Sequence, residues 1–170
     1  QEDTTQAPRR ELLVVDERTE TDSEGESTGL TDDLAASAPE EIDLVVMELD
    51  RSEDGLDRIG DQLEEMTQDG RLVDALHLVS HSEEGSITLG SVELSRQRLL
   101  EDDELLAQLR SWQPFLTEDA DIMIYGCNVA AGEDGRAFIE QLAELTSADV
   151  AASDDLTGQN DAGTANWVLE

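Results

Sequence analysis

The chain has 170 residues, which suits one domain with a real hydrophobic core. Its charge is extreme, with 43 acidic residues against 10 basic residues and a formal net charge of −33. This surface repels nucleic acid and anionic membranes, because binding to phosphates requires cations. It is typical of a heavily hydrated protein from a saline habitat, where salt screens the self-repulsion; divalent-cation binding in a secreted setting is the alternative.

Two further features of the sequence limit the possible functions. No apolar run approaches the roughly 18 residues that cross a bilayer, so we expect no membrane insertion. Cys127 is the only cysteine, which excludes an internal disulfide. A lone thiol fits a cytosolic protein, or a catalytic or buried cysteine in any compartment.

The first half of the chain predicts three strands and two helices. We expect a disordered lead over residues 1–10 and a single domain over residues 11–170. In chain order the patterns predict a strand at 11–15, an acidic loop at 16–29, a short helix at 32–38, a strand at 42–49, a helix from Leu56 to Met66 capped by Ser52, and a strand at 72–80.

The second half continues the alternation of strands and helices. The patterns predict a small hairpin at 87–94 about Gly90 and Ser91, a helix at 99–109, a strand at 122–126, a helix at 134–145, a strand at 148–153 and an edge strand at 165–170.

This alternation is typical of βαβ units in a parallel sheet. The apolar runs are continuous, as expected of strands that are covered on both faces. We therefore expect an α/β fold, a three-layer sandwich with a mostly parallel central sheet.

Two residues able to do chemistry follow neighbouring strands of this predicted sheet. His81 follows the run ALHLVS, and Cys127 follows the run DIMIYG. Ligand sites in such sheets form outside the carboxyl ends of the strands, so these two side chains are expected at one edge. A thiolate nucleophile and its base require that proximity.

Each of these residues also has a plainer interpretation. Cys127 is equally explained as a small buried core residue, although a following helix would favour its thiolate. His81 is equally explained as a loop histidine bonded to a carboxylate. His77, inside the strand, is interpreted as a hydrogen-bonded core histidine. Asp154 and Asp155 follow the strand at 148–153, where capping or an Asx-turn explains them.

Metals and nucleotides have little support. Residues 50–61 place Asp50, Ser52, Asp54, Gly55 and Asp61 as in a calcium loop, but a strand precedes them, and a turn with capping carboxylates explains them as well. HLVSH lacks the glutamate of a zinc-peptidase motif, and neither GxGxxG nor a P-loop is present. We expect no metal and no cofactor.

Four segments resemble a bacterial family of unknown function, the DUF4347 domain. They are ELLVVDER, VDALHLVSH with EGSITLGS, the stretch from DIMIYGCNVAAGEDG to ASDDLTG, and the closing NWVLE. Members usually stand near the start of very large secreted or surface proteins with adhesin-like repeats. The resemblance therefore implies an N-terminal module of a secreted or cell-surface protein.

That family is in turn similar to the caspase and gingipain group of cysteine peptidases. The likeness implies a caspase-like fold in which His81 is the base and Cys127 the nucleophile. It implies an oxyanion hole formed by the N–H groups of Ser82, which stands where the group has glycine, and of Cys127. Asp154 or Asp155 would line a pocket for Arg or Lys. The implied partner is a polypeptide substrate or the protein's own downstream chain.

Two other functions remain open at this point. One is a non-catalytic module of the same fold that binds or anchors a partner. The other is a calcium-dependent adhesion module, which the acidic composition allows.

Overall fold

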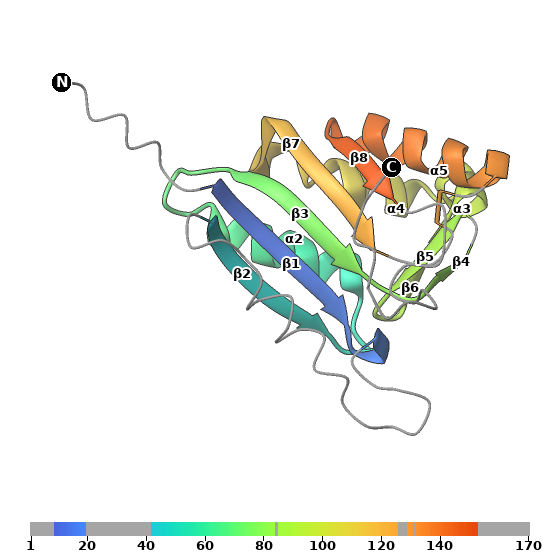
Figure 1. The fold of residues 1–170 in the computed structure, drawn as a ribbon, viewed down its shortest axis with the longest axis horizontal. Coiled ribbons are helices and arrows are strands. Elements are labelled where there is room, and N and C mark those ends of the chain that lie inside the picture. Colours follow the sequence, from blue (N-terminus) through green and yellow to red (C-terminus); the bar gives the residue numbers. More distant parts are fainter. Residues whose placement is uncertain (1–8, 20–41, 84, 126–128, 131, 153–170) are drawn as a thin grey trace, which may run out of the picture.

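The computed structural model describes residues 9–19, 42–83, 85–125, 129–130 and 132–152 (Figure 1). A central sheet has the strand order β2-β1-β3-β7-β8, and its neighbouring strands are parallel. Its strands are β1 (Arg9–Asp16), β2 (Ile42–Leu49), β3 (Val73–Val79), β7 (Leu116–Tyr125) and β8 (Asp149–Ala152). The predicted α/β class is confirmed: the parallel sheet is flanked by helices, consistent with a three-layer sandwich. The closer likeness to caspases stays a prediction.

The continuous apolar runs located the five central strands. β2 has the predicted bounds, whereas β7 begins at Leu116, well before the predicted start at residue 122. β1 begins at Arg9, so its first two residues come from the segment predicted as a disordered lead. The predicted helix at 32–38 and the predicted strand at 165–170 lie outside the described residues.

Arg10 explains why β1 begins early. Its guanidinium donates to both carboxylate oxygens of Asp69, at 2.8 and 2.7 Å, and to the carbonyl oxygen of Met66 at 2.5 Å. Met66 is the last residue of helix α2 (Gly55–Met66), where carbonyl groups favour a cation. The Arg10 side chain is only 9 % exposed, so these bonds compensate a nearly buried charge and fix the start of β1 to the end of α2.

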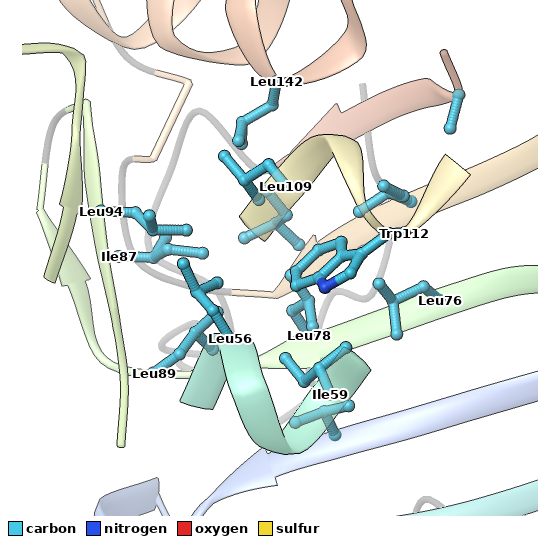
Figure 2. Packing of buried hydrophobic residues seen from close by; sticks show 14 of the residues in the cluster. Leu56, Ile59, Leu76, Leu78, Ile87, Leu89, Leu94, Leu109, Trp112 and Leu142 are labelled. Atoms are coloured by element: carbon cyan, nitrogen blue, oxygen red, sulfur yellow. The ribbon is translucent and has the colours of Figure 1, made fainter. Parts of the chain in front are cut away.

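Helices α2, α4 (Asp103–Arg110) and α5 (Gly132–Thr146) share one hydrophobic core with the sheet. Each lies on a connection that crosses the sheet in the same direction, from β2 towards β8. Crossovers of one hand that step the same way lie on one face of a sheet. Figure 2 shows this core around the buried Trp112, with side chains from β3, α2, α4, α5 and a hairpin: Leu76, Leu78, Leu56, Ile59, Leu109, Leu142, Ile87, Leu89 and Leu94.

The alternate residues of the central strands form a second, smaller cluster. Leu13, Val15 and Val79 are buried there, with Leu44 and Tyr125 packed against them. Successive side chains of a strand point to opposite faces, so this cluster lies across the sheet from the main core. Both faces of β1 and β3 are therefore apolar, as their uninterrupted runs predicted.

The predicted hairpin is confirmed and forms part of a second sheet, made of β4 (Ser82–Glu83), β5 (Ser86–Leu89) and β6 (Val92–Ser95). Its turn is at Gly90, whose φ is +63°. A Cβ atom on Gly90 would lie 2.2 Å from the carbonyl oxygen of Glu53. That oxygen accepts the N–H of Ser91 at 2.7 Å, so the hairpin turn contacts the segment before α2.

The predicted cap of α2 was wrong. Asp54, rather than Ser52, precedes the helix, and its carboxylate accepts the N–H groups of Leu56 and Asp57. Ser52 donates its N–H and its hydroxyl to Asp50 instead. Aspartate is among the preferred N-cap residues, so a local capping interaction sets the first residue of α2.

The predicted helix at 99–109 is two helices, α3 (Arg96–Glu101) and α4. Asp102 divides them, with an extended backbone at φ −106° and ψ 99°. Its carboxylate accepts the N–H of Leu105 and the N–H of Glu104, and these bonds lower the pKa of Asp102. A capping carboxylate therefore starts a new helix inside an apolar pattern that could have run on.

None of the helices in the part of the chain that the structure describes is long and apolar enough to cross a membrane.

We expect Gly90→Ala to destabilise the protein several-fold more than Gly70→Ala. Both glycines have positive φ, so each alanine pays the left-handed penalty of about 1–2 kcal/mol. Only the Cβ at position 90 meets backbone atoms, whereas nothing lies within 4 Å of a Cβ at position 70. Urea unfolding of the two variants measures the difference, and equal losses would contradict the close approach at Gly90.

We expect the pair of Arg10 and Asp69 to stabilise the fold in a pH-dependent way. Hydrogen bonding to Arg10 holds the pKa of Asp69 well below its usual range. A depressed folded-state pKa contributes stability that is fully present above the unfolded pKa of about 3.9 and is lost as the pH falls through the folded pKa.

The measurement is the urea midpoint of the wild type and of Asp69→Asn at successive pH values. Their difference should be largest above about pH 5 and should shrink below about pH 4. Asp121→Asn, which removes a carboxylate 3.4 Å from the exposed Arg9, is the matched control for one lost negative charge. A constant difference between wild type and Asp69→Asn at every pH would contradict the expectation.

Candidate functional site at the carboxyl edge of the central sheet

His81 lies at the predicted place, directly after β3 and Ser80, at the carboxyl edge of the sheet. Its side chain is exposed, and its Nε2 atom lies 3.1 Å from the carbonyl oxygen of Arg18. A carbonyl oxygen only accepts, so Nε2 carries the proton. In the neutral imidazole the lone pair then belongs to Nδ1, which is the nitrogen able to take a proton from a reacting group.

The backbone of His81 is also held. Its carbonyl oxygen accepts the hydroxyl of Ser80 at 2.8 Å and the N–H of Thr88 in β5 at 3.4 Å. The Ser80 hydroxyl also contacts the carbonyl oxygen of Thr88. The histidine therefore projects from a backbone position that the hairpin fixes.

Cys127 lies outside the described residues, but the chain on both sides of it is placed. The carbonyl oxygen of Tyr125, the last residue of β7, accepts the N–H of Ser80 at 3.2 Å. The carbonyl oxygen of Val129 accepts the N–H of Gly85 at 3.1 Å. The segment before residue 126 and the segment after residue 128 are thus both bonded to the stretch from Ser80 to Gly85.

Ser82 lies in β4, opposite Ile87 of β5. Opposite residues of an antiparallel pair alternate between hydrogen-bonded and non-hydrogen-bonded pairs. His81 and Thr88 are the bonded pair of this ladder, because the Thr88 N–H donates to the His81 carbonyl. Ser82 and Ile87 therefore form the non-bonded pair, and the backbone N–H of Ser82 points away from β5.

The remaining predicted site residues, Asp154 and Asp155, lie outside the described residues. β8 ends at Ala152, and it pairs in parallel with β7 through Ile124. The chain therefore leaves β8 at the same edge of the sheet as it leaves β3 and β7.

Asp16 and Arg18 belong to this edge and were missed by the sequence analysis, which assigned them to an acidic loop. Asp16 is 1 % exposed, and its carboxylate accepts the N–H of Gly90 at 2.8 Å and the N–H of Arg18 at 3.0 Å. A signal was present, because Asp16 directly follows a buried strand, at the edge where His81 was expected.

His77 is a hydrogen-bonded histidine inside the fold, as predicted. Its Nε2 atom lies 2.7 Å from a carboxylate oxygen of Glu11, and its Nδ1 atom lies 3.1 Å from the hydroxyl of Tyr125. The two rings also stack, with centroids 5.9 Å apart. Burial, and the nearby charge of Glu11, raise the pKa of Tyr125. These contacts account for both nitrogens of His77 within the fold.

The possible calcium loop, residues 50–61, is a turn over residues 50–54 followed by the first residues of α2, which begins at Gly55. The hydrogen bonds from Ser52 to Asp50 lower the pKa of Asp50, and Asp54 caps the helix. Capping carboxylates, the alternative interpretation of this sequence, therefore describe the geometry. Among the residues that the structure places, no group of three or more His, Cys, Asp or Glu side chains could hold a metal ion.

The protein is therefore an α/β protein whose candidate site lies at the carboxyl edge of its central parallel sheet. The family model for a domain of unknown function, DUF4347, matches residues 26–170. The match covers most of the chain, so the protein belongs to the DUF4347 family, and the resemblance found in the sequence is confirmed. No curated protein matches the chain.

We expect His77→Phe to destabilise the protein by about 3 kcal/mol, because it removes the imidazole that hydrogen-bonds the buried Glu11 carboxylate. Replacing both members with apolar residues, in Glu11→Met with His77→Phe, should recover most of that loss. A double-mutant cycle of urea unfolding measures the coupling. Losses that simply add would show that the pair contributes no net interaction.

Proposed function

We propose that this protein is a cysteine peptidase-like module in which His81 is the base and Cys127 the nucleophile. The observation that carries the proposal is the bond from His81 Nε2 to the Arg18 carbonyl, which leaves Nδ1 as the basic nitrogen at the carboxyl edge. The substrate would be a polypeptide or the protein's own downstream chain. The whole would be an N-terminal module of a large, acidic, secreted or cell-surface adhesin-type protein from a saline habitat.

Chain connectivity supports the proposed pair. Consecutive Cα atoms are about 3.8 Å apart, so the Cα atoms of Tyr125 and Cys127, two peptide units apart, are separated by at most about 7–8 Å. Tyr125 is bonded to Ser80, the neighbour of His81 in the chain. Val129, two residues after Cys127, is bonded to Gly85, which follows β4. Both anchors favour a thiol within reach of the imidazole.

In the proposed reaction Nδ1 of His81 takes the proton of the Cys127 thiol. The thiolate attacks the carbonyl carbon of a peptide bond, and the C–N bond breaks as His81 gives the proton to the leaving amine. Water then attacks the thioester carbon as one of its protons goes to His81; the C–S bond breaks, and the leaving thiolate takes that proton back to restore the thiol. The Arg18 carbonyl holds a proton on Nε2 throughout, so Nδ1 is the nitrogen that gains and loses the transferred proton.

The direction of the Ser82 N–H supports the second half of the proposal. It points away from β5, so the ladder leaves it able to donate to an oxyanion, together with the N–H of Cys127. Asp154 or Asp155, which follow β8 at the same edge, would then select a basic side chain of the substrate. The net charge of −33 would also attract a cationic peptide at low salt.

We expect Cys127 to react with iodoacetamide unusually fast below pH 7. An ordinary thiol has a pKa of about 8.5, so only about 1 % of it is thiolate at pH 6.5. A thiolate formed with His81 would therefore react up to about 100-fold faster at that pH. The measurement is the labelling rate against pH in high salt, for the wild type and for His81→Ala.

The chain has one cysteine, so labelling reports Cys127 alone, and Cys127→Ser gives the background. Asp121→Asn is the matched control, because it changes one charge away from the carboxyl edge. The enhanced rate should disappear in His81→Ala and persist in Asp121→Asn. An ordinary thiol profile that His81→Ala leaves unchanged would exclude the peptidase.

A second candidate function is a non-catalytic module that binds or anchors a partner. The hydrogen bonds that fix the backbone of His81 favour it, because they give this edge a structural role that needs no turnover. The labelling experiment separates the two functions, since a binding module does not require a reactive thiol.

A further inference from the structure

Asp16 is a buried carboxylate whose two oxygens accept several hydrogen bonds. One oxygen accepts the N–H of Gly90 at 2.8 Å and Nη1 of Arg18 at 3.1 Å. The other accepts the backbone N–H of Arg18 at 3.0 Å, and Nη1 approaches it at 3.3 Å. A carboxylate that is 1 % exposed requires such compensation, because burying a charge without partners is costly.

These bonds fix the turn that carries the Arg18 carbonyl. Asp16 accepts the backbone N–H two residues ahead of it, which is an Asx-turn. The guanidinium of Arg18 returns over the same turn and also donates to the carbonyl oxygen of Gly90 at 2.9 Å. The side chain and the backbone of Arg18 are therefore both held, and its carbonyl oxygen is the group that meets Nε2 of His81.

The hairpin of β5 and β6 holds both ends of this contact. Gly90, at its turn, bonds Asp16 and Arg18 through its N–H and its carbonyl. Thr88, two residues earlier, bonds the carbonyl of His81. The hairpin is therefore bonded both to the turn that carries the Arg18 carbonyl and to the backbone of His81. These bonds fix the position of the carbonyl relative to the imidazole.

We propose that Asp16 is a positioning residue for His81, acting through Arg18. It holds the Arg18 carbonyl against Nε2 and so keeps the lone pair of the imidazole on Nδ1. Asp16 itself touches neither a substrate nor the reacting atoms. The inference rests on the proposed function only where it treats His81 as a base, because the tautomer of His81 can be measured without turnover.

Asparagine is the informative replacement at this position. Its amide keeps the size of the side chain, but one oxygen becomes an NH₂ group that only donates. Each Asp16 oxygen accepts a backbone N–H, from Arg18 or from Gly90. The NH₂ group of asparagine would therefore face one of these N–H donors, and the turn has to shift to separate them. The Arg18 carbonyl moves with it, and His81 loses the bond that selects its tautomer.

The first measurement is the tautomer of His81, from the ¹⁵N shifts of its ring in ¹⁵N-histidine-labelled protein. The chain has two histidines, so His81→Ala assigns the signals. The wild type should carry its proton on Nε2. Asp16→Asn should give a mixture of tautomers, while the control Asp121→Asn, the same chemical change at an exposed ion pair, should match the wild type.

The second measurement is the iodoacetamide rate of Cys127 against pH in the same variants. Removing the hydrogen-bond partner that orients a metal-binding histidine typically costs 10–100-fold, and the lower end of that range is the guide for an imidazole that acts as a base. We therefore expect Asp16→Asn to label at least about 10-fold more slowly than the wild type at pH 6.5. A general loss of packing would change the melting temperature without selecting a tautomer, so the two readouts separate positioning from stability.

Each outcome decides the proposal. A wild-type protein with the proton on Nδ1 overturns it, and so does a folded Asp16→Asn that keeps the wild-type tautomer and rate. If near-UV circular dichroism shows that Asp16→Asn is unfolded, Arg18→Ala decides, because it keeps the carbonyl and removes only the guanidinium clamp. An altered tautomer population in Arg18→Ala then supports positioning, and an unchanged one overturns it. An ordinary thiol in the wild type would end the peptidase proposal alone, and the tautomer would still decide this one.

Discussion

The hydrogen bond between the Asp16 carboxylate and the N–H of Gly90 joins parts of the chain that are far apart in sequence. Asp16 ends β1, an interior strand of the sheet, and Gly90 forms the turn of the hairpin beside the carboxyl edge. Gly90 also approaches Glu53 closely, just before α2. Strand, hairpin and helix start therefore meet at one backbone position, and only glycine fits there.

The buried charges of this protein are arranged in a common way. Asp16, Glu11 and Arg10 are each almost fully buried, and each has an oppositely charged or histidine partner within hydrogen-bond distance. The chain has ten arginines for 43 acidic residues, so a cation is a scarce partner. Salt screens exposed pairs more than buried ones, so pairs such as that of Asp16 and Arg18 keep their strength where surface attraction is weak.

Sequence patterns found the strands and missed the long-range polar contacts, for a physical reason. A continuous apolar run is a local property, and it gave the bounds of β2 directly. The break between α3 and α4 is also caused by a local feature, the capping carboxylate of Asp102. Predicting it requires comparing the strength of that cap with the apolar spacing that favours one continuous helix. The partners of Asp16 and of Arg10 lie far along the chain, and no local pattern specifies them.

The candidate site shows the same division. Placing His81 at the carboxyl edge required only the end of a strand and the geometry of parallel sheets. The tautomer of His81 depends on the Arg18 carbonyl, which comes from a segment that looked like an acidic loop. Fold topology therefore predicts which residues gather at an edge, whereas the chemistry of each residue depends on which backbone atoms the neighbouring turns present.

That dependence links stability and chemistry at this edge. The hydrogen bonds of Gly90 attach the hairpin to Asp16 and Arg18, and the same bonds hold the Arg18 carbonyl against the His81 imidazole. A substitution that loosens the hairpin would therefore lower stability and activity together, so loss of activity alone identifies no role for a residue here. Only a property of the imidazole itself, such as the nitrogen that carries its proton, distinguishes a residue that orients the base from one that merely supports the fold.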